Sequence, residues 1–183
     1  PIPASLLPNL RLPLIAAPMF LVSGSKLVIE CCRAGIIGTF PALNQRSSEA
    51  FAEWLQDIEA GRDAKSAVYG VNLIVHKSNP RLEADLKICV QHKVPLIITS
   101  LGAVKEIVQE VQRYGGVVFH DVTNRKHAEK AAGAGVDGLI AVAGGAGGHA
   151  GTINPFALLS EIRSFFPKTL ILAGALSRGE HIL

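Results

Sequence analysis

The sequence predicts an α/β fold, a (β/α)8 TIM barrel that is truncated after its seventh strand. The first observation is that strand-like and helix-like segments alternate seven times along 183 residues, with a mean repeat of roughly 25 residues. The second is that the strand-like segments are continuous apolar runs, as in parallel strands buried on both faces. Seven such units favour a barrel over a doubly wound sheet. Because a barrel needs an eighth strand, we expect residues 1–183 to form one incomplete barrel domain.

Each strand is predicted from a short apolar run that a glycine, proline or polar residue bounds. The seven runs are 13–17, 36–40, 69–75, 95–100, 117–121, 138–142 and 169–173. The intervening segments repeat apolar residues at helical spacing, most clearly at Val104, Ile107, Val108 and Val111. Asn79-Pro80 and Asn154-Pro155 have the cap-then-proline order of a helix start.

Composition narrows the class of protein. With 49% hydrophobic and 18% charged residues, the chain is predicted to be globular, and no apolar run reaches the roughly 18 residues of a membrane span. The absence of a signal-peptide pattern predicts a cytoplasmic protein. A net charge of +3 without a basic run argues against nucleic acid as a partner. Three cysteines without metal-ligand spacing predict reduced thiols and no metal site. The sequence leaves open whether the protein forms a homo-oligomer.

The run Gly144 to Gly151 is the most informative stretch, because it places five glycines and His149 directly after an apolar strand. Missing side chains let the main chain approach a ligand and adopt positive φ angles. A flexible connector is the alternative interpretation. The order of strand, glycine loop and helix start is that of ligand loops in α/β proteins, which favours a binding site.

The carboxyl ends of the other predicted strands supply further candidates, because barrels bind ligands at that edge. These ends carry small residues and amides with few charges, which suit a large planar ligand whose phosphate binds backbone N–H groups. They are Ala17-Pro18-Met19, Asn72, Thr99-Ser100, His120-Asp121 and Ala173-Gly174-Ala175.

Several of these residues have a structural alternative. Asn72 could satisfy backbone groups, and Met19 could fill the core. Strand alternation allows only one of His120 and Asp121 to face the pocket. Ser100 has no obvious base partner, so a serine nucleophile is not expected. The sequence has neither a P-loop nor a Rossmann fingerprint.

Together these motifs resemble the nitronate monooxygenase family, formerly called 2-nitropropane dioxygenases, which are FMN-dependent barrels. The resemblance covers essentially the whole chain. It rests on four stretches in this order: Pro13 to Met19, Gly70 to Leu73, Gly147 to Gly151 and Leu172 to Ala175.

The resemblance implies FMN as the cofactor and a role for each matching residue. Ala17, Pro18 and Met19 would line the flavin ring, and Asn72 would hydrogen-bond the flavin or its ribityl chain. Gly147 and Gly148 would admit the cofactor, Gly174 and Ala175 would hold its phosphate, and His149 would act on the substrate. Asp121 completes the expected cofactor-binding set, although the family often has a lysine there. The family's strand-eight Gly-Thr segment is absent from 1–183.

The resemblance further implies the reaction: O2 oxidises an alkyl nitronate or nitroalkane to a carbonyl compound and nitrite, with His149 as base or electrostatic partner. One alternative is a flavin-dependent enoyl-thioester reductase that uses NAD(P)H, since such enzymes share the barrel and a Gly-Gly-His segment. Another is a cofactor-free, inactive fragment. A phosphate-binding barrel aldolase or isomerase is disfavoured, because the strand ends lack a lysine or paired carboxylates.

Overall fold

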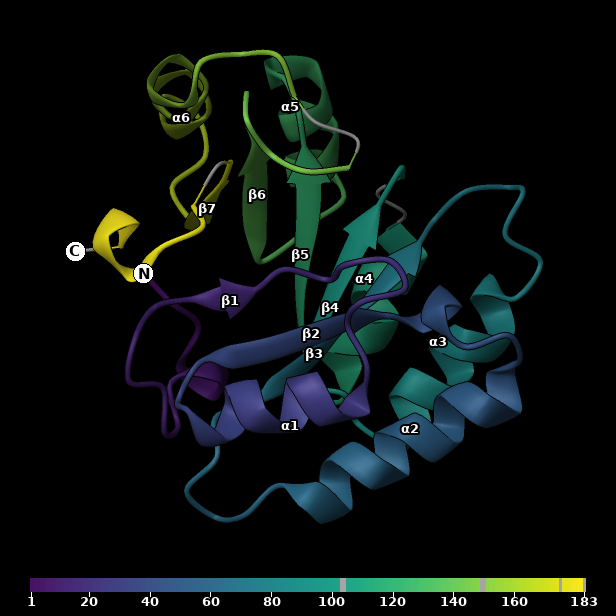
Figure 1. Cartoon of the computed structure of the whole chain (residues 1–183). Coiled ribbons are helices and arrows are strands. Elements are labelled where there is room, and N and C mark those ends of the chain that lie inside the picture. The colour runs from purple at the N-terminus through teal and green to yellow at the C-terminus, as the bar shows by residue number, and fades with distance from the viewer. Residues whose placement is uncertain (103–104, 149–150, 175, 183) are drawn as a thin grey trace.

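Seven parallel strands form one sheet in the computed structural model, which describes residues 1–102, 105–148, 151–174 and 176–182. They pair strictly in chain order, β1 to β7 (Figure 1). A doubly wound sheet would instead place its first strand inside the sheet. The strands are β1 (Ile15–Ala16), β2 (Ile37–Pro41), β3 (Tyr69–Ile74), β4 (Leu96–Ser100), β5 (Val117–Val122), β6 (Gly138–Val142) and β7 (Thr169–Ala173). The predicted barrel-type fold is confirmed.

The sheet curls, and the helices cover its outer, convex side (Figure 1). They are α1 (Ser25–Arg33), α2 (Ser48–Gly61), α3 (Leu82–Gln91), α4 (Lys105–Arg113), α5 (Arg125–Gly133) and α6 (Pro155–Arg163), with short 3-10 helices η1 (Ala4–Leu6), η2 (Ala42–Asn44) and η3 (Gly179–His181). β1 and β7 are the edges of the described sheet. The two ends of the chain lie near each other, and the Thr169 hydroxyl donates to the carbonyl of Pro1 at 2.6 Å. The result is an open barrel.

The two cap-then-proline motifs have different outcomes. Asn154 caps α6 through a hydrogen bond from the amide of Phe156 at 3.0 Å, and Pro155 is the first helical residue, as predicted. The prediction for Asn79-Pro80 is wrong in detail. The Asn79 side chain accepts from the Arg81 amide at 3.1 Å and closes a turn, so α3 begins only at Leu82.

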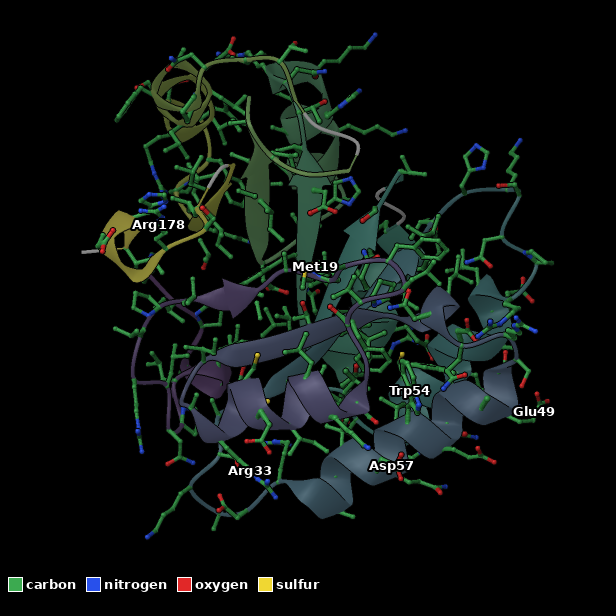
Figure 2. The ribbon with its side chains drawn as sticks, in the orientation of Figure 1. Met19, Arg33, Glu49, Trp54, Asp57 and Arg178 are labelled. Carbon is green, nitrogen blue, oxygen red and sulfur yellow. The ribbon has the colours of Figure 1, made fainter. Side chains whose placement is uncertain are left out.

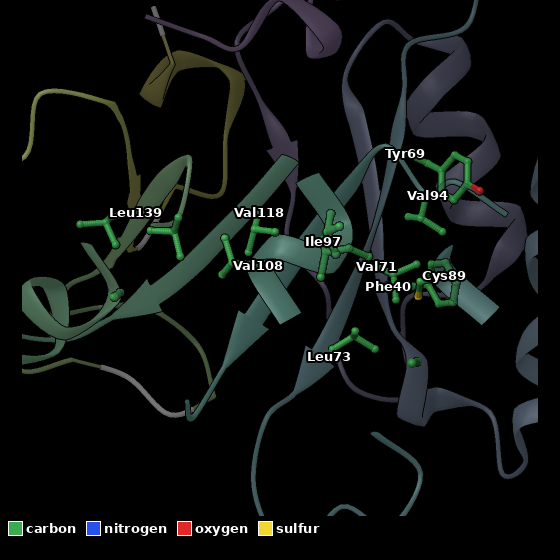
Figure 3. Close-up of a cluster of buried hydrophobic side chains, with 14 of the residues drawn as sticks. Phe40, Tyr69, Val71, Leu73, Cys89, Val94, Ile97, Val108, Val118 and Leu139 are labelled. Atoms are coloured by element: carbon green, nitrogen blue, oxygen red, sulfur yellow. The ribbon is translucent and has the colours of Figure 1, made fainter. Parts of the chain in front are cut away.

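Alternation along the strands divides the apolar side chains into two layers. The outer layer lies between sheet and helices (Figure 3) and includes Phe40, Val71, Ile97, Val118 and Leu139. The inner layer lies on the concave side and includes Ile37, Leu96, Ile98, Val117, Phe119 and Ile140. Leu6 of η1 is buried in the inner layer. The strands are therefore covered on both faces by their own chain, which explains their continuous apolar sequences.

The three cysteines are free thiols, as the sequence predicts. No helix among the described residues is long and apolar enough to cross a membrane. In the same part of the chain, no three His, Cys, Asp or Glu side chains gather in a way that could hold a metal ion.

Candidate active site at the carboxyl edge of the sheet

A row of polar side chains crosses the inner face of the sheet where β3, β4 and β5 end. The amide of Asn72 donates to the Ser100 hydroxyl at 2.7 Å and to the Ile98 carbonyl at 3.1 Å. The Ser100 hydroxyl in turn donates to Oδ2 of Asp121 at 2.5 Å. Three residues on the neighbouring strands β3, β4 and β5 thus form one hydrogen-bonded chain. Asp121 is the acceptor that the sequence did not reveal for Ser100.

His120 and Asp121 lie on opposite faces of β5, as strand alternation requires. His120 is buried towards the helices, and its Nδ1 lies 2.7 Å from the Thr99 hydroxyl. Burial lowers the pKa of His120 to about 4, because the charged imidazolium cannot be solvated there. His120 is therefore neutral at pH 7 and is separated from the inner face by the sheet itself.

Asp121 is the member of the pair that faces the concave side. Burial raises its pKa to about 6, while the hydrogen bond from Ser100 acts in the opposite direction. No charged group of the described residues contributes to this shift. The inner face therefore holds a carboxyl group that gains or loses its proton near neutral pH.

The loop after β1 carries the three residues expected to line a flavin ring. Ala17 is exposed, Pro18 is half-buried, and 42% of Met19 is exposed. Figure 2 labels Met19 on this loop between β1 and α1. The exposure of Met19 rules out the alternative that it fills the core, and it leaves the thioether available to a ligand.

The described part of the glycine loop, residues 144–148, has the bare main chain that its sequence predicts. Gly145 and Gly148 have φ angles of 90° and 68°, which strongly favour glycine. A Cβ atom added at Gly147 or Gly148 would meet no atom within 4 Å. Among the described residues, the N–H groups of Gly145, Gly147 and Gly148 find no acceptor. This combination of open space and available N–H groups can accept an anionic or planar ligand.

Two other glycines hold the ends of this loop against the sheet. A Cβ at Gly151 would lie 1.9 Å from the carbonyl oxygen of Val142, so the chain can pass there only as glycine. Gly174 follows β7 with a φ of 158°, and its Cβ position is 3.1 Å from the Gly144 carbonyl. The loops after β6 and β7 therefore lie against each other.

The structure brings some of the expected site residues together, and others lie outside the described residues. It joins Asn72 to Asp121 through Ser100, and it brings Gly174 against Gly144. His149 and Ala175 lie outside the described residues. A separate cavity of about 530 Å³ lies beside the carboxyl edge, bordered by His76, Lys77, Leu101 and Lys130 among others, and none of the expected cofactor residues lines it.

Comparisons with known proteins test the fold and the kind of chemistry. No family model matches the chain. A curated relative in Rhodococcus jostii, a (3aS,4S,5R,7aS)-5-hydroxy-7a-methyl-1-oxo-octahydro-1H-indene-4-carboxyl-CoA dehydrogenase, is 25% identical over 167 residues. This alignment covers 91% of the chain and 46% of the relative.

Two solved structures superpose on nearly the whole chain. FabK from Thermotoga maritima gives a TM-score of 0.84 at 22% identity, covering 96% of this chain and 54% of FabK. A nitroalkane oxidase from Streptomyces ansochromogenes gives 0.82 at 21% identity, covering 96% and 62%. The chain has the fold of these proteins. It spans about half the length of the curated relative, and the named activities among these proteins are oxidoreductase activities.

Proposed function

We propose that the chain forms most of the catalytic barrel of an FMN-dependent oxidoreductase. The proposed reaction is oxidation of an alkyl nitronate or nitroalkane by O2 to a carbonyl compound and nitrite. The observation that carries this proposal is the loop of residues 144–148, whose open space and available N–H groups can accept a flavin mononucleotide. The nitroalkane oxidase with the same fold supports the proposed substrate class. Three free thiols agree with the cytoplasm as its location.

The described residues of the expected site leave room for a flavin and offer it polar and apolar contacts. A Cβ atom at Gly147 or Gly148 would meet nothing within 4 Å, which leaves open space that a flavin ring or ribityl chain could use. Asn72 uses both amide hydrogens within the protein, so the acceptor Oδ1 is the atom it can offer to a ligand. Pro18 and Met19 supply an apolar surface, and Gly174 with Ala175 would hold the phosphate. When bound, FMN supplies the electron transfer that the reaction needs.

In this proposal His149 accepts the α-proton of the substrate and stabilises its negative charge. A neutral imidazole can take the α-proton of a nitroalkane, and the resulting imidazolium stabilises the nitronate. For a substrate that arrives as nitronate, a protonated His149 would bind the anion directly. We expect His149→Ala in the full-length protein to retain FMN and lose about 10²- to 10⁴-fold in turnover.

The test is FMN titration followed by nitrite release from a nitronate under air. A shift of the flavin absorption spectrum with saturable nitrite formation is the expected result. A full-length protein that stays colourless after FMN is added and removed by gel filtration would contradict the cofactor assignment. An alanine variant that released nitrite as fast as the wild type would contradict the role of His149.

A flavin-dependent enoyl-thioester reductase is the second candidate, and Asp121 is the observation that favours it. An ionised carboxylate on the inner face repels an anionic nitronate but not an uncharged enoyl thioester. NAD(P)H-driven bleaching of the bound flavin, without nitrite formation, would identify this activity. Neither NAD(P)H bleaching nor nitrite formation is expected if the chain belongs to a cofactor-free protein.

A further inference from the structure

The loop between β1 and α1 exposes four apolar side chains in a row. The exposed fractions are 42% for Met19, 67% for Phe20, 77% for Leu21 and 65% for Val22. Side chains that remain in water contribute little apolar burial, which is the main term that holds other segments in place. The shape of this loop therefore depends on hydrogen bonds rather than on packing.

Three of those hydrogen bonds come from one side chain, that of Asn44 in η2. Its Nδ2 donates to the carbonyl of Met19 at 3.0 Å and to the carbonyl of Ser23 at 2.8 Å. Its Oδ1 accepts from the amide of Leu21 at 3.1 Å. Asn44 thus binds both ends and the middle of the loop, across a sequence separation of more than 20 residues.

The loop conformation is one that the chain would not adopt by itself. Leu21 has a φ of 60°, in the left-handed region, where a leucine is disfavoured by roughly 1–2 kcal/mol. Such a residue persists only where the surroundings hold it. The Leu21 amide is the group that Asn44 binds, and Ser23 adds a further bond by accepting from the Met19 amide at 3.0 Å.

Contacts outside the β1–α1 loop hold Asn44 in place. It ends the turn that follows β2, where Ala42 is buried, and Arg81 of the β3–α3 connection binds the carbonyl of the next residue, Gln45. At the end of β1, the Thr39 hydroxyl donates to the carbonyl of Ala16. The core of the sheet thus supports the group that shapes an exposed loop.

We propose that Asn44 is a positioning residue: it presets the main chain of residues 17–23 so that Ala17, Pro18 and Met19 meet the cofactor without rearrangement. The inference rests on the proposed function, because it takes those three residues as the flavin-lining segment. Preorganisation increases affinity by removing the entropic cost of ordering the loop on binding. Asn44 itself need not touch the flavin.

The test compares Asn44→Ala with Asn9→Ala in the full-length protein. Asn9 is a matched control because its Nδ2 also donates to two main-chain carbonyls, those of Ala64 at 3.0 Å and Ser66 at 3.2 Å, in the connection that precedes β3. Asn9 has a φ of 58°, which strains an alanine at this position. The control substitution is therefore at least as destabilising as Asn44→Ala. We expect Asn44→Ala to weaken FMN binding at least tenfold and Asn9→Ala to leave it within about twofold.

Two further readouts distinguish positioning from general destabilisation. Hydrogen exchange of the peptide that contains Leu21 should accelerate in Asn44→Ala and not in Asn9→Ala. Asn44→Asp keeps the acceptor for the Leu21 amide but places a carboxylate oxygen against the carbonyls of Met19 and Ser23, which need a donor, so its FMN affinity should fall at least as far as that of Asn44→Ala. The circular dichroism of bound flavin should change together with FMN affinity, in the same order of variants.

Each outcome decides a separate point. Wild-type FMN affinity in Asn44→Ala, or an equal loss in both alanine variants, would overturn the positioning role. A wild-type protein that bound no FMN would overturn the proposed function and with it the link to the cofactor. In that case unchanged exchange at Leu21 in Asn44→Ala would also overturn the role of Asn44 in holding residues 17–23, whereas faster exchange would keep that role for another ligand.

Discussion

The two faces of the sheet give polar side chains different surroundings. On the outer face, His120 is sealed between strands and helices and is held neutral. On the inner face, the neighbouring Asp121 ends a hydrogen-bonded chain beside the loops that leave room for a ligand. One step along the strand separates a residue of the core from a residue of the candidate site. Polarity alone therefore does not identify a candidate site residue, whereas the face of the sheet on which it lies does.

The largest effect is expected on the outer side, where a charge is fully buried. Asp85 of α3 is 0% exposed and accepts from Ser48 of α2 at 2.6 Å, and its carboxylate lies 3.0 Å from the Arg81 guanidinium. Arg81→Leu leaves this carboxylate without its cation and should cost about 3–5 kcal/mol of unfolding free energy. Urea unfolding measures the loss.

The double variant Arg81→Leu with Asp85→Leu is the control for that experiment. Removing both partners leaves no buried charge, so part of the stability should return. A single variant as stable as the wild type would show that the Arg81–Asp85 pair does not stabilise the fold.

A smaller effect is expected from the pH dependence of stability. Asp121 on the inner face and His120 on the outer face should change stability in opposite directions as the pH falls. The pKa of folded Asp121 is raised to about 6 from the usual 3.8, so its contribution to stability is present at low pH and is lost as the pH rises from about 4 to 6. His120 has its pKa lowered from the usual 6.5 to about 4, so its contribution is lost as the pH falls from 6.5 towards 4. The two trends oppose each other in the wild type.

Asp121→Asn separates the two trends because asparagine stays neutral and can still accept from Ser100. We expect this variant to be more stable than the wild type by up to ~3 kcal/mol at pH 8 and equal to it near pH 3.5. Thermal unfolding across the pH range gives the difference at each point. A difference that did not vary with pH would show that Asp121 is not buried as the structure has it.

The smallest effect on stability should come from the glycine loop, and it tests the ligand directly. Gly147→Ala places a methyl group where the structure has nothing within 4 Å, so the fold should tolerate it. Gly133→Ala, at the end of α5, enters equally open space and is the matched control. We expect the unfolding free energy of both variants to stay within about 1 kcal/mol of wild type.

FMN binding should nevertheless separate these two variants. Gly147→Ala should weaken it about tenfold or more, because the methyl group takes space that the cofactor would use, and Gly133→Ala should not change it. Isothermal titration measures both affinities. Equal affinities in the two variants would remove Gly147 from the cofactor site.

Local sequence signals determined the order of strands and helices and most of the candidate positions. Continuous apolar runs mark strands that are covered on both faces, and proline after asparagine correctly marks the start of α6 at Pro155. The glycine-rich composition of residues 144–151 likewise predicts a main chain that is largely free of side chains. These features follow from short-range sterics and burial, so they can be read without knowing what lies nearby.

Which of these residues meet depends on the folded arrangement of the strands. Asn72, Ser100 and Asp121 are separated by more than 20 residues at each step, and their hydrogen bonds depend on strand register and curvature. Asn44 carries no sequence signal, because an asparagine after an apolar run usually only ends a turn. Its three bonds to residues 19–23 exist because neighbouring parallel strands deliver their loops to the same edge of the sheet.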